Sequence, residues 1–397
     1  MRIMQINSVP YGSTGRIMFA IAGQARRMGH TAFCTTGFSW HKADQPHYFL
    51  TSGIVEKELH TVLAKCTGYN GHFSHHATRR LLRFMDSYRP DVIHLHNLHG
   101  WYLNLPMLFH YIKANRIPVV WTLHDCWAFT GQCAHFAYAG CGRWREGCGH
   151  CPQLNRYPQS YVDRTEFLLR EKRELFSGVE RMTIVTPSQW LAGMAGQSFL
   201  GEYPIRVIPN GIDLDTFRPR ERSDLSFDTG GKKLILGVSL GWDQRKGLDV
   251  FTELADRLGP AYQIVLVGTD RETDRSLPEG IISIHRTHDR RELAELYSAA
   301  DVFVNPTRED TFPTVNLEAL ACGTPVITFE NGGSAECLDE SCGCAVPPED
   351  IAALQREILR VCTTSPYSRA ACRERAKGFD ADEQFKKYIG LYASLPD

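Results

Sequence analysis

With 397 residues, the chain is longer than the roughly 250 to 300 residues at which a single hydrophobic core stops growing, so its length predicts two domains. Hydrophobic residues make up 43% and charged residues 22%, which excludes a disordered chain. The net charge of −1 is unevenly distributed: residues 1–190 hold 21 Lys and Arg against 12 Asp and Glu, and the remainder holds 23 against 33. A basic half can attract an anionic membrane surface or a phosphate-bearing substrate, and scattered solubilising charge is the alternative.

Short apolar segments, each followed by a turn and a helical pattern, recur along the chain as in parallel βαβ units. The predicted strands are 2–7, 31–35, 91–96, 119–123 and 183–186, then 233–238, 263–268, 281–284, 302–306 and 325–329. This pattern predicts an α/β protein of two Rossmann-like domains, 1–201 and 202–378, which face each other across a cleft. We expect a loop at 218–233 near the junction and a terminal helix in 379–397 that packs back on the first domain.

The N-terminus runs straight into the first predicted strand. It has no apolar stretch long enough for a signal peptide or a membrane span, so a cytoplasmic protein is expected. The basic half adds the expectation of peripheral attachment at the inner face of the cytoplasmic membrane. No nucleic-acid partner is expected.

A glycine-containing turn follows the first predicted strand. Gly12 and Gly15 relieve backbone crowding there, so that main-chain amides at the next helix start can meet a phosphate, and Arg16 adds a cation. Such turns are common after strands, so this signal is weak when taken alone.

Histidines lie at two other strand ends of the first half. His96 ends one strand, and His124 with Asp125 ends another. Because ligands bind outside the carboxyl ends of parallel strands, these side chains are candidates for lining a cleft. With 16 histidines in the chain, capping or packing is the commoner role for any one of them.

Five of the 13 cysteines fall between Cys126 and Cys151. Four of them have a spacing that can close a tetrahedral zinc site, with a Cys-x-x-Cys pair as its second half: Cys133, Cys141, Cys148 and Cys151. A structural zinc ion is one interpretation. Free thiols come next, and disulfides come last for a cytosolic protein.

A glycine-containing loop with two adjacent cations follows the predicted strand 233–238. Gly237 and Gly241 lie at the strand end, and Arg245 and Lys246 follow. Two cations on one loop can neutralise a phosphate, and a solvated basic turn is the plainer interpretation.

The stretch 305–326 predicts a strand end, an acidic turn, a helix and another strand. Pro313 is favoured at a first helical position, so the helix should begin near it and direct its N–H groups at an anion. Glu309 and Asp310 lie just before this start and can accept hydrogen bonds from sugar hydroxyls, and Glu318 can do the same with a ribose. An acidic turn that only stabilises the helix dipole is the alternative.

This stretch resembles the carboxylate-pair signature of the family-4 retaining glycosyltransferases, which have the GT-B fold. In that family two carboxylates lie eight positions apart, as Asp310 and Glu318 do, and the residues from Glu318 to Val326 match the family pattern closely. The family usually has Glu in place of Asp310 and Gly in place of Pro313. Because Asp310 is shorter and Pro313 removes an amide donor, the resemblance leaves Glu309 as an alternative sugar contact.

The resemblance also implies roles for the other candidates. Lys246 would bind the donor diphosphate, and Arg245 would replace an arginine that the family often has at the position of Gly241. Glu318 would bind the ribose, and His124 would lie beside the donor sugar. The further residues implied are Phe312, Thr314, Val315, Gly237 and Gly241 for the donor, and Gly12, Gly15, Arg16, His96 and Asp125 for the acceptor and cleft.

The segment 126–153 resembles an insertion found in bacterial capsular and exopolysaccharide glycosyltransferases of the colanic-acid type. The resemblance implies a wall of the acceptor site, with any metal there holding the loop only. The implied reaction is hexosyl transfer from a UDP- or GDP-sugar to a sugar hydroxyl of a lipid-linked oligosaccharide, with retention and without a catalytic cofactor. The alternatives are a GT-B epimerase or phosphorylase and a catalytically inactive nucleotide-binding scaffold.

Overall fold

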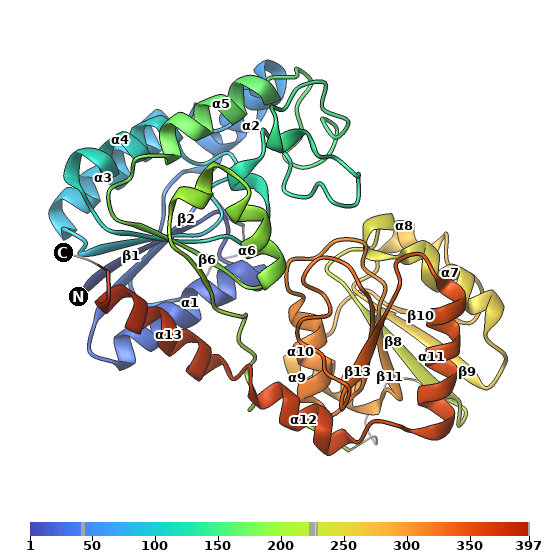
Figure 1. The fold of residues 1–397 in the computed structure, drawn as a ribbon. Helices are drawn as coiled ribbons and strands as arrows, with labels where there is room; N and C mark the ends of the chain where they lie inside the picture. Colours follow the sequence, from blue (N-terminus) through green and yellow to red (C-terminus); the bar gives the residue numbers. More distant parts are fainter. Residues whose placement is uncertain (41–43, 222–226, 228, 396–397) are drawn as a thin grey trace. The chain divides into compact units, whose positions relative to one another are not determined.

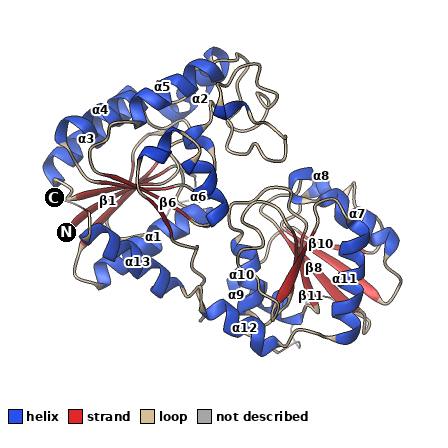
Figure 2. Ribbon diagram, in the orientation of Figure 1, coloured by secondary structure: helices blue, strands red, loops and turns tan. Residues whose placement is uncertain are grey.

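The computed structural model describes residues 1–40, 44–221, 227 and 229–395. The chain forms two compact units, unit 1 of Met1–Pro209 with Gln384–Asp397, and unit 2 of Asn210–Glu383. In each unit, helices cover both faces of a parallel sheet (Figures 1 and 2). Residues 222–226 and 228 of the predicted junction loop, and 396–397 of the predicted terminal helix, lie outside the described residues.

Among the described residues, unit 1 has a seven-stranded sheet in the order β3-β2-β1-β4-β5-β6-β7, with every pairing parallel. Its strands are β1 (Arg2–Asn7), β2 (Thr31–Thr36), β3 (Tyr48–Leu50), β4 (Val92–Leu95), β5 (Val119–Thr122), β6 (Met182–Thr186) and β7 (Ile205–Val207). The order reverses between β1 and β4, and such a reversal opens a crevice at the carboxyl ends of the two strands.

The helices of this unit are α1 (Gly12–Arg27), α2 (Ile54–Thr67), α3 (His75–Tyr88), α4 (Leu105–Asn115), α5 (Thr165–Phe176), α6 (Gln189–Gly196) and α13 (Ala381–Ala393). Helices α3, α4 and α5 lie over one face of the sheet, and α1 and α13 lie over the other (Figure 1). The last helix belongs to unit 1 from Gln384 onward, so the chain returns to its first unit at its end.

In the described part of unit 2, a six-stranded parallel sheet has the order β10-β9-β8-β11-β12-β13. Its strands are β8 (Lys233–Val238), β9 (Tyr262–Val267), β10 (Ile281–Ile284), β11 (Val302–Asn305), β12 (Val326–Phe329) and β13 (Gly343–Val346). Its helices are α7 (Leu248–Arg257), α8 (Arg271–Asp274), α9 (Arg290–Ala299), α10 (Thr314–Ala321), α11 (Ile351–Thr364) and α12 (Arg369–Lys377). The reversal here lies between β8 and β11.

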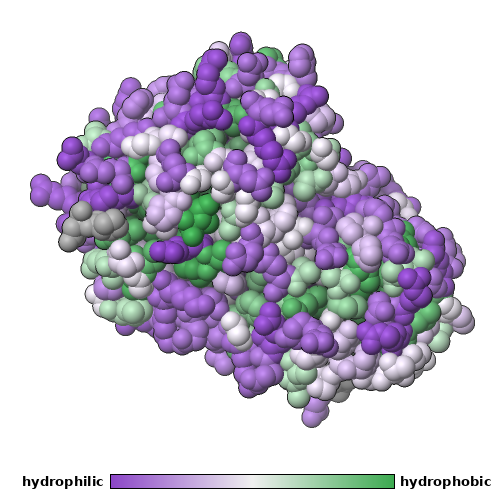
Figure 3. Space-filling model, viewed as in Figure 1, coloured by the Kyte–Doolittle hydropathy of each residue, from purple (hydrophilic) through white to green (hydrophobic). Residues whose placement is uncertain are grey.

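Successive residues of the unit 2 strands enter two different cores. Leu234 and Leu236 pack in the cluster under α9 and α10, whereas Ile235 packs in the cluster under α7 and α11. This is the alternation expected of a strand that is buried on both faces. Polar residues cover most of the visible surface, and apolar residues show there in small separate areas (Figure 3).

The α/β prediction is confirmed, and each of the ten predicted strands has a counterpart in the two sheets. Strands β3, β7 and β13 were not predicted. None of the helices that the structure describes combines the length and the apolarity needed to cross a membrane.

Candidate functional site

Unit 2 brings two predicted binding loops together at one point of its sheet. The loops after β8 and β11 leave from neighbouring strands, where the strand order reverses. In open α/β sheets this is the place where ligands bind. The first loop carries Arg245 and Lys246 on the short 3-10 helix Gln244–Lys246, and the second carries Glu309 and Asp310.

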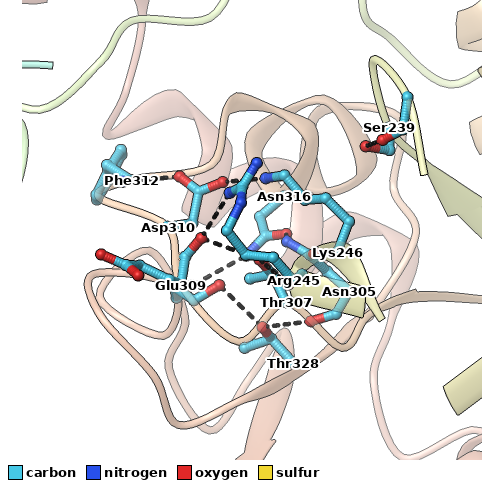
Figure 4. A network of polar contacts seen from close by, with 12 residues as sticks. Ser239, Arg245, Lys246, Asn305, Thr307, Glu309, Asp310, Phe312, Asn316 and Thr328 are labelled. Carbon is cyan, nitrogen blue, oxygen red and sulfur yellow. Dashed lines mark hydrogen bonds and ion pairs between the residues drawn. The ribbon is translucent and has the colours of Figure 1, made fainter. Parts of the chain in front are cut away.

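Lys246 and Asp310 form an ion pair at this point (Figure 4). The Lys246 Nζ donates to Oδ2 of Asp310 at 2.7 Å, and the two side chains are 23% and 19% exposed. Oδ1 of Asp310 accepts from the main-chain N–H of Phe312 at 3.2 Å, which orients the carboxylate. A partly exposed ammonium and a carboxylate are thus adjacent, and they can bind a phosphate and a sugar hydroxyl respectively.

Arg245 binds the main chain of the acidic turn. Its Nη1 donates to the carbonyl oxygen of Glu309 at 3.1 Å. The Glu309 residue is only 1% exposed, and its carboxylate points away from the Lys246–Asp310 pair (Figure 4). Of the two acidic candidates, Asp310 is therefore the one whose side chain lies with the lysine.

Arg308, which the sequence did not predict, ties these loops to the rest of unit 2. Its guanidinium is buried and binds both oxygens of Glu349 at 2.6 and 2.7 Å and both oxygens of Asp249 at 2.7 and 2.8 Å. Glu349 and then Asp249 raise the pKa of Arg308 above its ordinary value. Because bidentate arginine–carboxylate contacts fix geometry as well as charge, they hold the neighbouring turn in place.

A second unpredicted set of contacts surrounds the Asp310 turn. Asn316 of α10 accepts from Nδ2 of Asn305 at 2.8 Å and donates to the carbonyl of Ser334 at 2.9 Å. Gly332 has a φ of +60°, and a Cβ at this position would lie 2.1 Å from the Asp310 carbonyl oxygen. The strand end, the turn and the helix are therefore held as one assembly.

Glu318 is buried on α10, where Tyr297 of α9 orients it. The Tyr297 hydroxyl donates to Oε2 of Glu318 at 3.0 Å, and Glu318 is 6% exposed. Burial, followed by the negative charge of Glu318, raises the pKa of Tyr297, so the hydroxyl remains a donor. No sequence pattern predicted Tyr297, because it lies 21 positions before its partner.

The start of α10 is close to its predicted place. The helix begins at Thr314, and Pro313 is its N-cap residue, with a ψ of 118°. Thr314 and Val315 are partly exposed in the first turn. Phe312 is 3% exposed, and its ring centre lies 5.7 Å from that of Phe379, so its ring packs in the core.

The two glycines predicted near the end of β8 are needed for different physical reasons. A Cβ on Gly237 would lie 2.6 Å from the ring of Phe251 and 2.8 Å from Leu266, so this glycine makes room for core side chains. Gly241 has a φ of +110° and open space around it, so there the backbone conformation requires glycine. Only Gly241 lies in the loop itself.

In unit 1, the glycine turn is part of the first helix. Helix α1 begins at Gly12, which has a φ of +69°. A Cβ on Gly15 would lie 2.4 Å from the backbone carbon of Pro10, so only glycine fits there. Asn7 holds the turn, since its Nδ2 donates to Val9 O at 3.0 Å and to the Thr14 hydroxyl at 3.3 Å. Arg16 is exposed on this helix.

The predicted histidines meet at the carboxyl ends of β4 and β5. Nδ1 of His96 lies 3.0 Å from Nε2 of His124, and Nε2 of His96 lies 3.0 Å from Oε1 of Gln5 on β1. Burial, opposed by Asp125 and assisted by His99, lowers the pKa of His124 to about 4. His124 is therefore neutral near pH 7.

Asp125 holds the start of the insertion. Its Oδ2 accepts from Nε2 of His99 at 2.8 Å, and its Oδ1 accepts from the N–H of Trp127 at 2.9 Å. Burial alone would raise the pKa of Asp125, but His99, His135 and the Trp127 amide outweigh it and lower the value to about 2. Both oxygens thus have partners within unit 1.

The four predicted zinc ligands surround one small pocket together with Phe136 and Trp144: Cys133, Cys141, Cys148 and Cys151. All 13 cysteines are free thiols. Next to the pocket, the buried Lys172 donates to the carbonyls of Trp127 at 2.7 Å and Thr130 at 3.0 Å. Among the residues that the structure describes, however, no group of three or more His, Cys, Asp or Glu side chains is arranged to hold a metal ion.

Sequence comparisons place both units among glycosyltransferases. A profile described as Glycosyltransferase Family 4 matches residues 14–216, and one described as Glycosyl transferases group 1 matches residues 232–364. The WcaC protein of Escherichia coli (strain K12), named as a colanic acid biosynthesis glycosyl transferase, is 30% identical over 319 residues, or 77% of each chain. A D-inositol 3-phosphate glycosyltransferase of Mycobacteroides abscessus is 31% identical over 206 residues, or 47% of this chain and 46% of that protein.

Solved structures show the same fold at lower identity. Sucrose-phosphate synthase of Thermosynechococcus elongatus has a TM-score of 0.72 and 18% identity, over 99% of this chain and 98% of that one. HepE of Anabaena, crystallised with UDP-glucose, has a TM-score of 0.69 and 14% identity, over the whole of both chains. The architecture is therefore GT-B. These matches do not favour the epimerase, phosphorylase or scaffold alternatives.

Proposed function

The chain belongs to glycosyltransferase family 4, and on that basis we propose that it moves a hexosyl unit from a UDP- or GDP-sugar to a sugar hydroxyl of a lipid-linked oligosaccharide, with retention, during synthesis of a bacterial surface polysaccharide. The name of WcaC supports the polysaccharide, and the UDP-glucose in the HepE crystal supports the donor class. The observation that carries the proposal is the placement of Lys246 beside Asp310 at the strand-order reversal of unit 2.

In the proposed reaction, negative charge develops on the nucleoside diphosphate as its bond to the sugar breaks. Lys246 and Arg245 neutralise that charge, which lowers the energy of the transition state. The donor phosphate then competes with Asp310 for the Lys246 ammonium, and the released carboxylate accepts a hydrogen bond from a donor-sugar hydroxyl. Glu318, oriented by Tyr297, accepts from the ribose hydroxyls.

Unit 1 supplies the acceptor side of the proposal. His124 lies beside the reacting sugar, and the Gly12–Arg16 turn, His96 and Asp125 shape the acceptor pocket. The insertion 126–153 forms one wall of that pocket, and its four cysteines hold a structural zinc ion. The cations of unit 2 carry the charge stabilisation, so the reaction needs no catalytic metal or organic cofactor.

The proposed site of action is the inner face of the cytoplasmic membrane. The exposed side chains of α3 include Arg79 and Arg83, which are suited to anionic headgroups. Neighbouring α2 exposes Val55, Leu59 and Val62, which are 78%, 57% and 56% exposed and lie on one helical face. An apolar stripe beside arginines is typical of peripheral attachment.

The proposal is tested by incubating the protein with a panel of UDP- and GDP-sugars and following release of free nucleotide. We expect one donor to be hydrolysed slowly, and Lys246→Ala to reduce that rate on the order of 10²-fold, because one transition-state contact is lost. Glu318→Ala should chiefly raise the donor KM.

Lys233→Ala is the matched control, because Lys233 pairs with Asp301 at 3.0 Å at the opposite end of β8. Its activity should equal that of the unmodified protein. If no donor in the panel is hydrolysed although nucleotide still binds, the result would support a scaffold instead. If Lys246→Ala and Lys233→Ala reduce the hydrolysis rate equally, the result would contradict the proposed role of Lys246.

A further inference from the structure

Two aromatic residues meet at the carboxyl ends of the unit 1 strands. Trp101 follows β4 and Tyr157 lies between β5 and α5, and their ring centres are 5.4 Å apart with an interplanar angle of 80°. The neighbouring Gly100 lies against the loop after β1, since a Cβ on it would be 3.1 Å from the Cβ of Ser8 and 3.6 Å from the Tyr157 hydroxyl oxygen. The strand order reverses between β1 and β4, so the two rings lie where ligands bind in such sheets.

Buried polar groups hold Tyr157 at its hydroxyl end. The hydroxyl lies 2.8 Å from Nδ1 of His99, and Nε2 of this buried histidine donates to Oδ2 of Asp125 at 2.8 Å. Burial, and then the charges of Asp125 and Tyr11, raise the pKa of Tyr157 above its ordinary value, so the phenol is neutral. The residue is nevertheless 49% exposed. Because most of the surface of a tyrosine belongs to its ring, the ring is open to solvent while the hydroxyl is held.

The main chain beside Tyr157 is anchored as well. Nε2 of the buried Gln132 donates to the carbonyl oxygen of Pro158 at 2.5 Å, and the Tyr161 N–H donates to the carbonyl oxygen of Lys65 on α2 at 2.8 Å. An exposed ring that is already fixed loses little conformational freedom when a ligand covers it, which favours binding.

Trp101 has a conformation that is costly for its residue type. Its φ is +60°, a left-handed backbone conformation that is rare for a bulky residue. No described residue accepts a hydrogen bond from its buried indole N–H. A glycine at this position would avoid both costs, and such costs are concentrated at binding sites. The contact that Trp101 provides in return is the support of the Tyr157 ring.

We propose that Tyr157, supported by Trp101 and His99, is a sugar-binding platform that stacks on one face of a pyranose ring. A pyranose presents C–H groups on its faces and hydroxyls around its edge. The face of an aromatic ring is negative and attracts the weakly positive C–H groups, so the two rings bind face to face. The pyranose is a sugar of the acceptor, an identification that rests on the proposed function.

The platform is tested by saturation-transfer NMR of the full chain without nucleotide sugar. The probes are the methyl pyranosides of D-glucose, D-galactose and D-mannose. We expect at least one probe to be saturated at the C–H protons of one face, and Tyr157→Ala to reduce this saturation about fivefold because the stacked ring is lost. Tyr157→Phe, which keeps the ring, should retain most of it.

Tyr161→Ala is the matched control, because Tyr161 is 68% exposed on the same segment and should not contribute. If Tyr157→Ala fails to fold, Tyr157→Leu removes the aromatic face at a more similar side-chain volume. Equal saturation in the unmodified protein and the non-aromatic variant, equal losses in the Tyr157 and Tyr161 variants, or no saturation of any probe would overturn the proposal.

This measurement is independent of transfer. If saturation depends on Tyr157 but no donor is hydrolysed, the platform stands and the proposed function fails. If a donor is hydrolysed but saturation does not depend on Tyr157, the proposed function stands and the platform fails.

Discussion

At the scale of single residues, a substitution of Gly15 tests whether the turn after β1 requires glycine at this position. Its Cβ position is 2.4 Å from the Pro10 backbone, which cannot move like a side chain. We expect Gly15→Ala to lower the free energy of unfolding by about 1–3 kcal/mol, as overpacking does. Thermal or urea unfolding, followed by circular dichroism, measures the change.

Gly23 lies on the same helix and is the control. Its Cβ position meets only the end of the Arg27 side chain at 3.9 Å, so Gly23→Ala should be neutral or stabilising by up to about 1 kcal/mol. If the two variants lose stability equally, a shared effect on α1 explains the loss, and the Pro10 contact does not, because replacing Gly by Ala within a helix favours the helix.

Some residues of the candidate site could be predicted from the sequence one by one, and others could not. Lys246 and Asp310 were predicted separately from their loops, and the structure brings them together because β8 and β11 are neighbours. Arg308 and Tyr297 were missed, because a buried arginine or tyrosine acquires a role only from partners that lie far along the chain. The ring of Phe312 packs in the core of unit 2, and its predicted contact with the donor stays a prediction.

At the scale of elements, the insertion tests the zinc proposal. We expect about one zinc ion per chain in purified protein, and thiolate-to-cobalt absorption after cobalt exchange, because four thiolates form a tetrahedral site. The thiols must close on the ion, since the described side chains hold no ready ligand set. The buried Lys172 ammonium would then offset part of the thiolate charge.

Cys141→Ser should abolish stoichiometric zinc, whereas Cys66→Ser should leave it unchanged, because Cys66 is exposed on α2 and does not line the pocket. Metal-free protein with unchanged stability and no cobalt band would contradict a zinc site and identify the pocket as a cluster of free thiols.

Elements were predictable where their apolar pattern is strong. Most of the predicted strands are buried among neighbours, such as β1 and β8, which run for six residues each, and the edge strand β10 was predicted because three of its four residues are isoleucine. β3 and β7 have three residues each and lie at the edges of their sheet, so they bury too little apolar surface to leave a pattern. β13 begins with glycine, a residue that weakens a strand because it has no side chain to pack. This strand forms by pairing with β12.

At the scale of the whole molecule, the excess of basic residues in the first half of the chain predicts binding to anionic membranes, which can be tested. We expect the protein to float with anionic vesicles at low salt and to remain unbound at high salt or with neutral vesicles. Reversing two charges on α3, with Arg79→Glu and Arg83→Glu, should abolish the binding. The matched reversal in unit 2, with Arg271→Glu on α8 and Arg275→Glu at its C-cap, should not.

Binding that persists at high salt, or equal losses in the two double variants, would contradict attachment through the basic face of unit 1. Vesicles with neutral headgroups distinguish a purely apolar contribution of α2 from an electrostatic one.

The return of α13 to unit 1 has a consequence for the order in which the protein is made. Tyr388 and Tyr392 complete the hydrogen bonds of Thr122 and His94, yet they leave the ribosome after the whole of unit 2. At about 5–20 residues per second, the first unit waits roughly ten seconds or more for its last buried partners. Until then its interior polar groups lack these bonds, so the first unit to emerge is completed by a helix that follows unit 2 in the chain.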